Sequence, residues 1–108
     1  MTDARLAITT VGSEEAADRI AATLVEERLA ACVSIVPGVL SIYRWEDAVQ
    51  RDREWLLLIK TQASRLPALE ARLKELHSYA LPEFLVLQPE GGSAEYLAWV
   101  LGQSALLS

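Results

Sequence analysis

The sequence is short of the residues that support several common kinds of chemistry. It has one cysteine, Cys32, and one histidine, His77, among 108 residues. Because one thiol cannot form an intrachain disulfide and small secreted domains usually depend on disulfides, we expect a protein of the reducing cytoplasm. Gly91 and Gly92 form an isolated glycine pair, and no serine lies in a nucleophile-elbow motif. The sequence therefore gives no support for a nucleotide cofactor or an enzymatic role.

Positive charge and long apolar runs are also scarce. The chain has 10 Lys and Arg residues against 15 Asp and Glu residues, a net charge of −5, which is the wrong sign for binding a phosphate backbone. The longest uncharged run, residues 29–43, is interrupted by Pro37 and Gly38 and is too short to span a bilayer. The N-terminus lacks the basic and then apolar pattern of a signal peptide. We therefore expect neither nucleic acid nor a membrane as a partner.

Apolar residues, in contrast, are abundant. They make up 52% of the chain, and the mean hydropathy is +0.20. A domain of this size has much surface and little interior, so its own core cannot hide this many apolar side chains. We therefore expect a second buried surface.

Local patterns predict one domain, residues 1–108, with a flexible N-terminus at residues 1–4. Ser13 is the expected cap of the first helix and Ser64 that of the second. The order strand, helix, strand, strand, helix, strand indicates an α+β, ferredoxin-like sandwich, βαββαβ plus a C-terminal helix, with the first two helices on one face of an antiparallel sheet. The expected strands are 6–11, 32–36 continuing over 39–45, 54–60 and 84–87, and the last helix begins at Ser93.

Residues 44–54 include seven charged residues out of eleven, which is typical of a solvated hairpin tip rather than a binding patch. The following strand differs, since residues 55–59 are apolar on both faces, as are residues 84–87. A half-solvated sheet would alternate with polar residues, so we expect a symmetric oligomer that buries the second face. The alternative is a monomer in which the last helix covers that face. The expected interface residues are Trp45, Trp55, Leu57 and Ile59.

Cys32 and His77 each allow two interpretations. Cys32 lies in an apolar run, where a free cysteine is usually a small buried hydrophobe. His77 follows the second predicted helix, where an imidazole can interact with the carbonyl end. Thiolate, imidazole and carboxylate ligands also suit copper or zinc, and sites between subunits would collect ligands that the sequence keeps apart.

Several linked motifs resemble the CutA family of divalent-cation tolerance proteins, and the resemblance extends from Leu6 to about Leu101. It implies a ferredoxin-like subunit in a stable homotrimer similar to PII signalling proteins, a role in the response to divalent metals, notably copper, and no established enzymatic activity. The motifs are Glu26–Gly38, Ser41–Glu46, Lys60–Thr61, His77–Glu83 and Tyr96–Trp99.

The resemblance also implies candidate site residues. Its metal ligands correspond to Cys32, Glu54 and His77, with Cu²⁺ as the expected ion. Thr9 stands where some members have a second cysteine, and Ser78 stands where a proline is usual.

A set of polar positions resembles a cleft between subunits, namely Lys60, Tyr79 and Glu83, and Trp45 matches an aromatic residue of the hairpin. The alternative function is a PII-like signalling module that binds a small anionic ligand near Lys60 and Tyr79.

Overall fold

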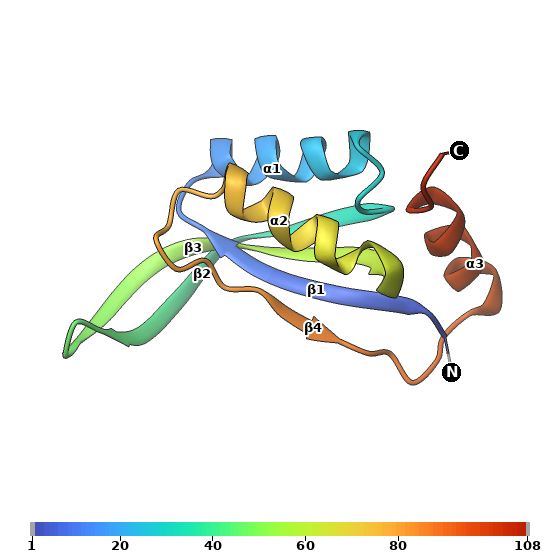
Figure 1. The fold of residues 1–108 in the computed structure, drawn as a ribbon. Coiled ribbons are helices and arrows are strands. Elements are labelled where there is room, and N and C mark those ends of the chain that lie inside the picture. The colour runs from blue at the N-terminus through green and yellow to red at the C-terminus, as the bar shows by residue number, and fades with distance from the viewer. Residues whose placement is uncertain (1, 108) are drawn as a thin grey trace.

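A computed structural model describes residues 2–107. Its four strands form one antiparallel sheet in the order β2-β3-β1-β4. Helices α1 and α2 lie on one face of this sheet, and α3 lies at its end (Figure 1). This is the predicted ferredoxin-like sandwich with its C-terminal helix. The elements are β1 (Ala4–Val11), α1 (Glu14–Glu26), β2 (Cys32–Trp45), β3 (Ala48–Gln62), a 3-10 turn (Ala63–Arg65), α2 (Leu66–Leu76), β4 (Leu85–Leu87) and α3 (Ala94–Gln103).

The ends of the elements follow local chemistry, with two differences from expectation. The Ser13 hydroxyl accepts from the Ala16 amide at 3.1 Å and caps α1 as predicted. Ser64 does not cap α2, because it lies inside the 3-10 turn that precedes the helix. The flexible terminus expected over residues 1–4 also differs from the structure, since Ala4 is buried and already belongs to β1. Met1 lies outside the described residues.

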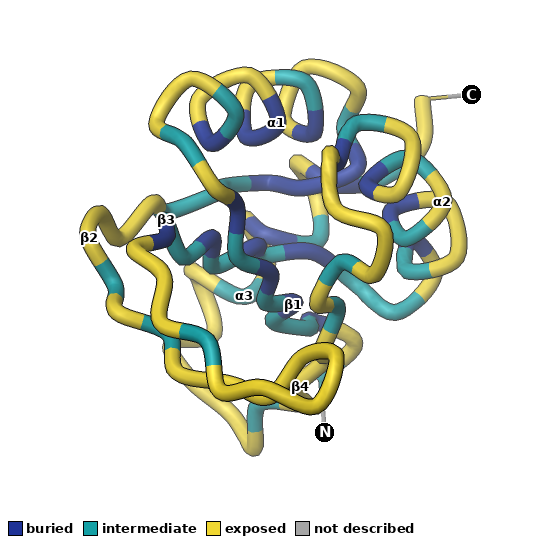
Figure 2. Tube along the Cα trace, turned by 90° about the vertical axis from the view of Figure 1, so that its left-hand side faces the viewer, coloured by how far each residue is buried: buried dark blue, intermediate teal, exposed yellow. Residues whose placement is uncertain are grey.

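Strands β2 and β3 form a long hairpin that projects from the body (Figure 1). The register shifts between Val36 and Val39, and Gly38 adopts a φ of +70°. The two residues of β2 between Val36 and Val39 therefore form the bulge at which the arm changes direction. The two-residue tip, Glu46 and Asp47, has positive φ at both positions, as a tight hairpin turn requires. Figure 2 shows that most of this arm is exposed.

The core lies between the sheet and the two helices, and it contains residues that the sequence had suggested for an interface. Leu57 and Ile59 are fully buried against α1 and α2. Trp55 shares this face of β3 and packs against the same core. Leu57 and Ile59 were therefore placed wrongly in the predicted interface, because the twofold alternation of β3 directs them toward the helices. Trp55 is only partly buried, and its role in the interface stays a prediction.

The other face of the sheet is largely uncovered. The register places Leu6 and Ile8 of β1 on this face. Their partners on β4 are Leu87 and Leu85, and Ile8 also pairs with Leu58 of β3. Leu85 and Leu87 are 58% and 50% exposed. Together with Leu56 and Val36, these side chains form what we call the open face.

Helix α3 covers one end of the sheet. Its Val100 packs with Ala4 and Ala31, and the Gln62 side-chain amide donates to the Leu101 carbonyl at 2.7 Å. The centre of the open face remains accessible in the subunit. In the monomer alternative the last helix would cover this face, but α3 covers only one end of it. None of the helices among residues 2–107 is long and apolar enough to cross a membrane.

Candidate functional site

A buried carboxylate lies where the hairpin arm leaves the body. Glu54 lies on β3 beside the bulge of β2, opposite Val39, and is 6% exposed. Its Oε2 accepts a hydrogen bond of 2.7 Å from the Tyr79 hydroxyl, which belongs to the loop between α2 and β4. This bond connects two segments that are 25 residues apart in the chain.

His77 fixes the backbone of that loop. Its Nε2 lies 2.8 Å from the Thr10 carbonyl oxygen, which can only accept, so Nε2 carries the proton. Its Nδ1 accepts from the Tyr79 backbone amide at 3.1 Å, and the two rings lie 4.7 Å apart. Both imidazole nitrogens are therefore engaged within the subunit, and His77 positions Tyr79.

Gly12 makes room for this arrangement. A Cβ atom at this position would lie 3.0 Å from the Tyr79 hydroxyl oxygen, closer than nearly all real Cβ contacts. A side chain here would require the Tyr79 hydroxyl to shift by a few tenths of an ångström, so the glycine that follows β1 favours the observed position of Tyr79.

Burial and proximity change the acid–base properties of the site. Burial, together with the hydrogen bond that its hydroxyl donates to Glu54, raises the pKa of Tyr79, so the hydroxyl stays protonated. Burial and the nearby Glu54 carboxylate raise the pKa of Glu83 above its ordinary value. The site therefore holds a carboxyl group, that of Glu83, whose ionisation is opposed by burial and by the neighbouring Glu54.

These groups line a cleft of about 960 Å³ between the hairpin arm and the loop over residues 78–83. Asp52 and three aromatic side chains, those of Tyr43, Trp45 and Tyr79, contribute to its walls. The Tyr43 hydroxyl donates to Asp52. We call this the acidic cleft.

The remaining predicted site residues lie elsewhere. Cys32 pairs with Lys60 in the β2–β3 register, and the Lys60 ammonium is 3.8 Å from the Cys32 sulfur and bonds to the Ser34 hydroxyl. Lys60 lies six positions along β3 from Glu54, which corresponds to roughly 20 Å of strand. Within one subunit, therefore, Cys32 does not join Glu54 and His77, and Lys60 does not join Tyr79 and Glu83. That these residues come together between subunits stays a prediction.

The donor geometry of a single subunit does not fit a metal ion. Among residues 2–107, no three His, Cys, Asp or Glu side chains converge closely enough to hold one. His77 has no free ring nitrogen, and the Cys32 sulfur faces an ammonium group. A metal that used these residues would need ligands from more than one subunit.

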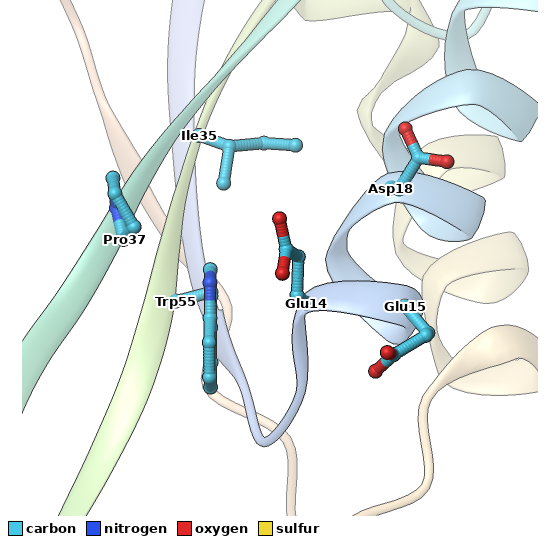
Figure 3. A pocket seen from close by; sticks show the side chains of 6 residues that line it. All are labelled: Glu14, Glu15, Asp18, Ile35, Pro37 and Trp55. Carbon is cyan, nitrogen blue, oxygen red and sulfur yellow. The ribbon is translucent and has the colours of Figure 1, made fainter.

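A second, shallower hollow of about 450 Å³ lies between the start of α1 and the sheet. Glu14 points from the helix toward Trp55 and Ile35 (Figure 3). Two of its acidic residues, Glu14 and Glu15, occupy the first turn of α1, where they interact favourably with the positive end of the helix dipole. This role accounts for their charge without a ligand.

Comparison with known families adds to this geometry. The model of the family described as CutA1 divalent ion tolerance protein matches residues 5–103. The chain belongs to this family. It is 55% identical over 91 residues to the divalent-cation tolerance protein CutA of Thermus thermophilus, an alignment that covers 84% of this chain and 88% of that protein. The chloroplastic CutA 1 protein of rice is 48% identical over 91 residues, covering 84% of this chain, which spans about half of that protein's length (51%).

Solved structures agree with the family assignment. CutA from Xylella fastidiosa superimposes with a TM-score of 0.94 at 40% identity, covering 96% of this chain and all of that one. A structure described as PII-like protein CutA, from Nostoc, gives a TM-score of 0.88 at 37% identity and covers 95% of this chain and 99% of that one. The family member studied here therefore has the CutA fold, which is PII-like, and the resemblance seen in its sequence is confirmed.

Sequence reasoning missed part of the acidic cleft of this family member. Asp52 and Tyr43 lie within or beside the charged run that was interpreted as a solvated hairpin tip. Alternation along β3 could have revealed Asp52, because Asp52 and Glu54 are two residues apart and therefore share a face. The contact between Gly12 and Tyr79 left no signal in the sequence.

Proposed function

We propose that the chain serves divalent-cation tolerance as a cytoplasmic homotrimer whose subunits meet through the open face. The observation that carries this proposal is the apolar character of a sheet face that the subunit's own helices leave uncovered. Isolated antiparallel sheets normally present polar residues to water on their second face. A contiguous apolar surface of this kind marks an interface.

The hairpin arm supports the same assembly. Along residues 39–45, β2 pairs with β3 and is an edge of the sheet, so one side of its backbone has free hydrogen-bonding groups. Trp45 is 43% exposed at the end of this arm, where its ring is available to a neighbouring copy. In a closed trimer, each arm would pair with or pack on the next subunit.

For the metal, we propose that Cu²⁺ is bound between subunits, with Cys32 and Glu54 supplied by different copies. Thiolate and carboxylate oxygen are both ligands that copper accepts. The distance along β3 between these residues within one chain argues for contributions from separate chains. We leave His77 out of this ligand set, because metal binding through it would break its contact with Thr10 or with Tyr79.

Calorimetry with Cu²⁺ tests this ligand set on the wild type, Cys32→Ser, Glu54→Gln and His77→Ala. We expect the first two variants to lose affinity, and His77→Ala to keep the wild-type value once its fold has been verified by circular dichroism. Equal affinity in all four proteins would remove Cys32 and Glu54 from the site. Loss of binding in His77→Ala alone would restore the ligand role first expected for His77.

A PII-like signalling role is the second candidate, favoured by the likeness to the Nostoc structure described as PII-like. The ligand expected from sequence was a small anion near Lys60 and Tyr79, but the cleft beside Tyr79 is lined by carboxylates. Native mass spectrometry of freshly purified protein distinguishes the two candidates. A bound organic molecule in place of metal would favour signalling, and metal alone would favour cation tolerance.

A further inference from the structure

The hairpin arm, residues 39–54, leaves the body where the sheet stops supporting it. Strand β1 pairs with β3 only as far as Trp55, so beyond this residue the arm consists of β2 and β3 alone. The β2–β3 ladder is interrupted at the same level, between Val36 and Val39. A two-stranded ribbon is marginally stable by itself. Other contacts must therefore fix the direction in which the arm projects.

The bulge of β2 has the properties of a hinge. Pro37 has no backbone N–H to donate to β3. Gly38 adopts a φ of +70°, and a Cβ atom at this position would have no neighbour within 4 Å. The Arg53 Nη1 donates to the Gly38 carbonyl at 3.1 Å, but both residues belong to the hairpin. This bond therefore braces the bulge without fixing the arm relative to the body.

The hydrogen bond between Tyr79 and Glu54 joins the root of the arm to the body. Glu54 is 6% exposed, so water has little access to compete for its carboxylate. Tyr79 is itself held by His77, which accepts from its backbone amide and whose ring lies 4.7 Å from the Tyr79 ring. His77 donates in turn to the Thr10 carbonyl of β1. The Tyr79 hydroxyl is thus a fixed point of the body to which Glu54 is bonded.

Beyond Glu54, open space separates the arm from the body. The acidic cleft, of about 960 Å³, lies between the arm and the loop over residues 78–83. Figure 2 shows that the arm is exposed along most of its length. A change of angle at the bulge would therefore widen or narrow this cleft and leave the buried core of the subunit unchanged.

We propose that Pro37 and Gly38 form a hinge, and that the hydrogen bond from Tyr79 to Glu54 is the latch that fixes the angle of the arm. Tyr79 is then a positioning residue for assembly. In a closed ring each arm must meet the next subunit at one angle, and an arm already held at this angle loses less conformational entropy on association. The effect on assembly rests on the proposed homotrimer, whereas the latch is a property of one subunit.

Tyr79→Phe is the variant that breaks the latch, since it removes the hydroxyl and keeps both the ring and the backbone amide that bonds to His77. Tyr43→Phe is the matched control. It also removes a hydroxyl that donates to a carboxylate, but this bond, to Asp52, lies within the arm.

A distance between the arm and the body tests the latch in the free subunit. Spin labels on Ala48→Cys at the arm tip and Ala71→Cys on α2 occupy exposed positions. Cys32→Ser removes the one native thiol, and Leu58→Asp on the open face keeps the chains apart. The labelled protein is washed with EDTA so that no metal competes with Tyr79 for Glu54.

Double electron–electron resonance should give a wider distribution of distances after Tyr79→Phe and an unchanged one after Tyr43→Phe. An equally narrow distribution in Tyr79→Phe would overturn the latch. Equal broadening by the two variants would also overturn it, because the loss of any hydroxyl near the arm would then have the same effect.

The role in assembly is measured without labels and without Leu58→Asp, so it does not depend on the folding of that variant. After dilution from urea at equal protein concentration, the Tyr79→Phe chain should associate more slowly than the wild type and Tyr43→Phe, as followed by light scattering. Equal rates in all three proteins would overturn the role of Tyr79 in assembly. A wild type that does not associate at all would contradict the homotrimer itself, and the distances in the free subunit would still judge the latch.

Discussion

The two faces of the central sheet use the same strands for different purposes. On the helix-facing side, Ala7, Thr9, Leu57 and Ile59 are 0% exposed, and this side forms the core of the subunit. On the open side, apolar residues of the same strands are half-buried or exposed, although their side chains are equally large. The comparison shows that apolar composition alone does not identify the core, because covering helices decide which face becomes the interior.

This difference assigns separate roles to neighbouring residues. Leu57 and Leu58 are adjacent on β3 and chemically identical, but they point to opposite faces. We therefore expect the helix-facing residue to control folding of the subunit, and the open-face residue to control association. Substitutions at these two positions compare the faces directly.

Leu57→Ala should have the largest effect on folding. The side chain is fully buried among the helices, so its truncation leaves a cavity and should lower the free energy of unfolding by about 3–4 kcal/mol. Urea denaturation at fixed protein concentration measures this loss, because stability of an oligomer depends on concentration. A loss below about 1 kcal/mol would mean that the helix-facing side is not the main core.

Leu58→Asp should leave the subunit folded and prevent its association. The introduced carboxylate reaches solvent in a free subunit but would be buried without a partner at an apolar interface. We expect a native far-UV circular dichroism spectrum and an unfolding transition that no longer depends on protein concentration. An unfolded variant, or one that keeps the wild-type concentration dependence, would contradict the assignment of the open face.

Thr9→Val should raise the free energy of unfolding, by less than Leu57→Ala lowers it. The Thr9 Oγ1 is buried on the helix-facing side without a hydrogen-bond partner among the described residues. Replacing the hydroxyl with a methyl group of similar size removes an unsatisfied polar atom, so we expect a gain of about 1 kcal/mol. Urea denaturation beside the wild type measures it, and a loss of stability would indicate that the hydroxyl has a partner in solution.

Glu83→Gln should produce the smallest change in the free energy of unfolding. The change should be measurable as an altered dependence of stability on pH. Because the pKa of Glu83 is raised by folding, protonation at acid pH favours the native state, and this contribution is lost as pH rises through the raised value. Removing the carboxylate should therefore increase stability slightly at neutral pH and flatten the profile above pH 4.5, the ordinary value. Parallel wild-type and variant profiles from thermal unfolding would contradict this.

Much of the fold could be predicted from the sequence, because its signals are local. The Ser13 cap, the break at Pro37 and Gly38 and the charged hairpin tip each act within a few residues. The sequence also predicted a second apolar face, but it assigned Leu57 and Ile59 to the wrong side. Since both faces of β3 are apolar, alternation alone could not show which one the helices cover.

The candidate site was less predictable, because it depends on contacts between distant segments. Its central pair, Glu54 and Tyr79, was expected in two separate sites, one for metal and one for an intersubunit ligand, and the structure joins them by a hydrogen bond. His77 was expected to bind metal, which stays a prediction, and the structure shows both of its ring nitrogens in contact with Thr10 and Tyr79. The composition of the sequence could not reveal these pairings, which arise from the packing of the α2–β4 loop beside the arm.

The central claim is that the open face is an interface between copies of this chain. Sedimentation velocity of the wild-type protein over a dilution series tests it most directly. We expect one species at three times the 11.9 kDa mass of the chain, persisting at low concentration. A single species at 11.9 kDa would contradict it and leave the apolar open face exposed to water.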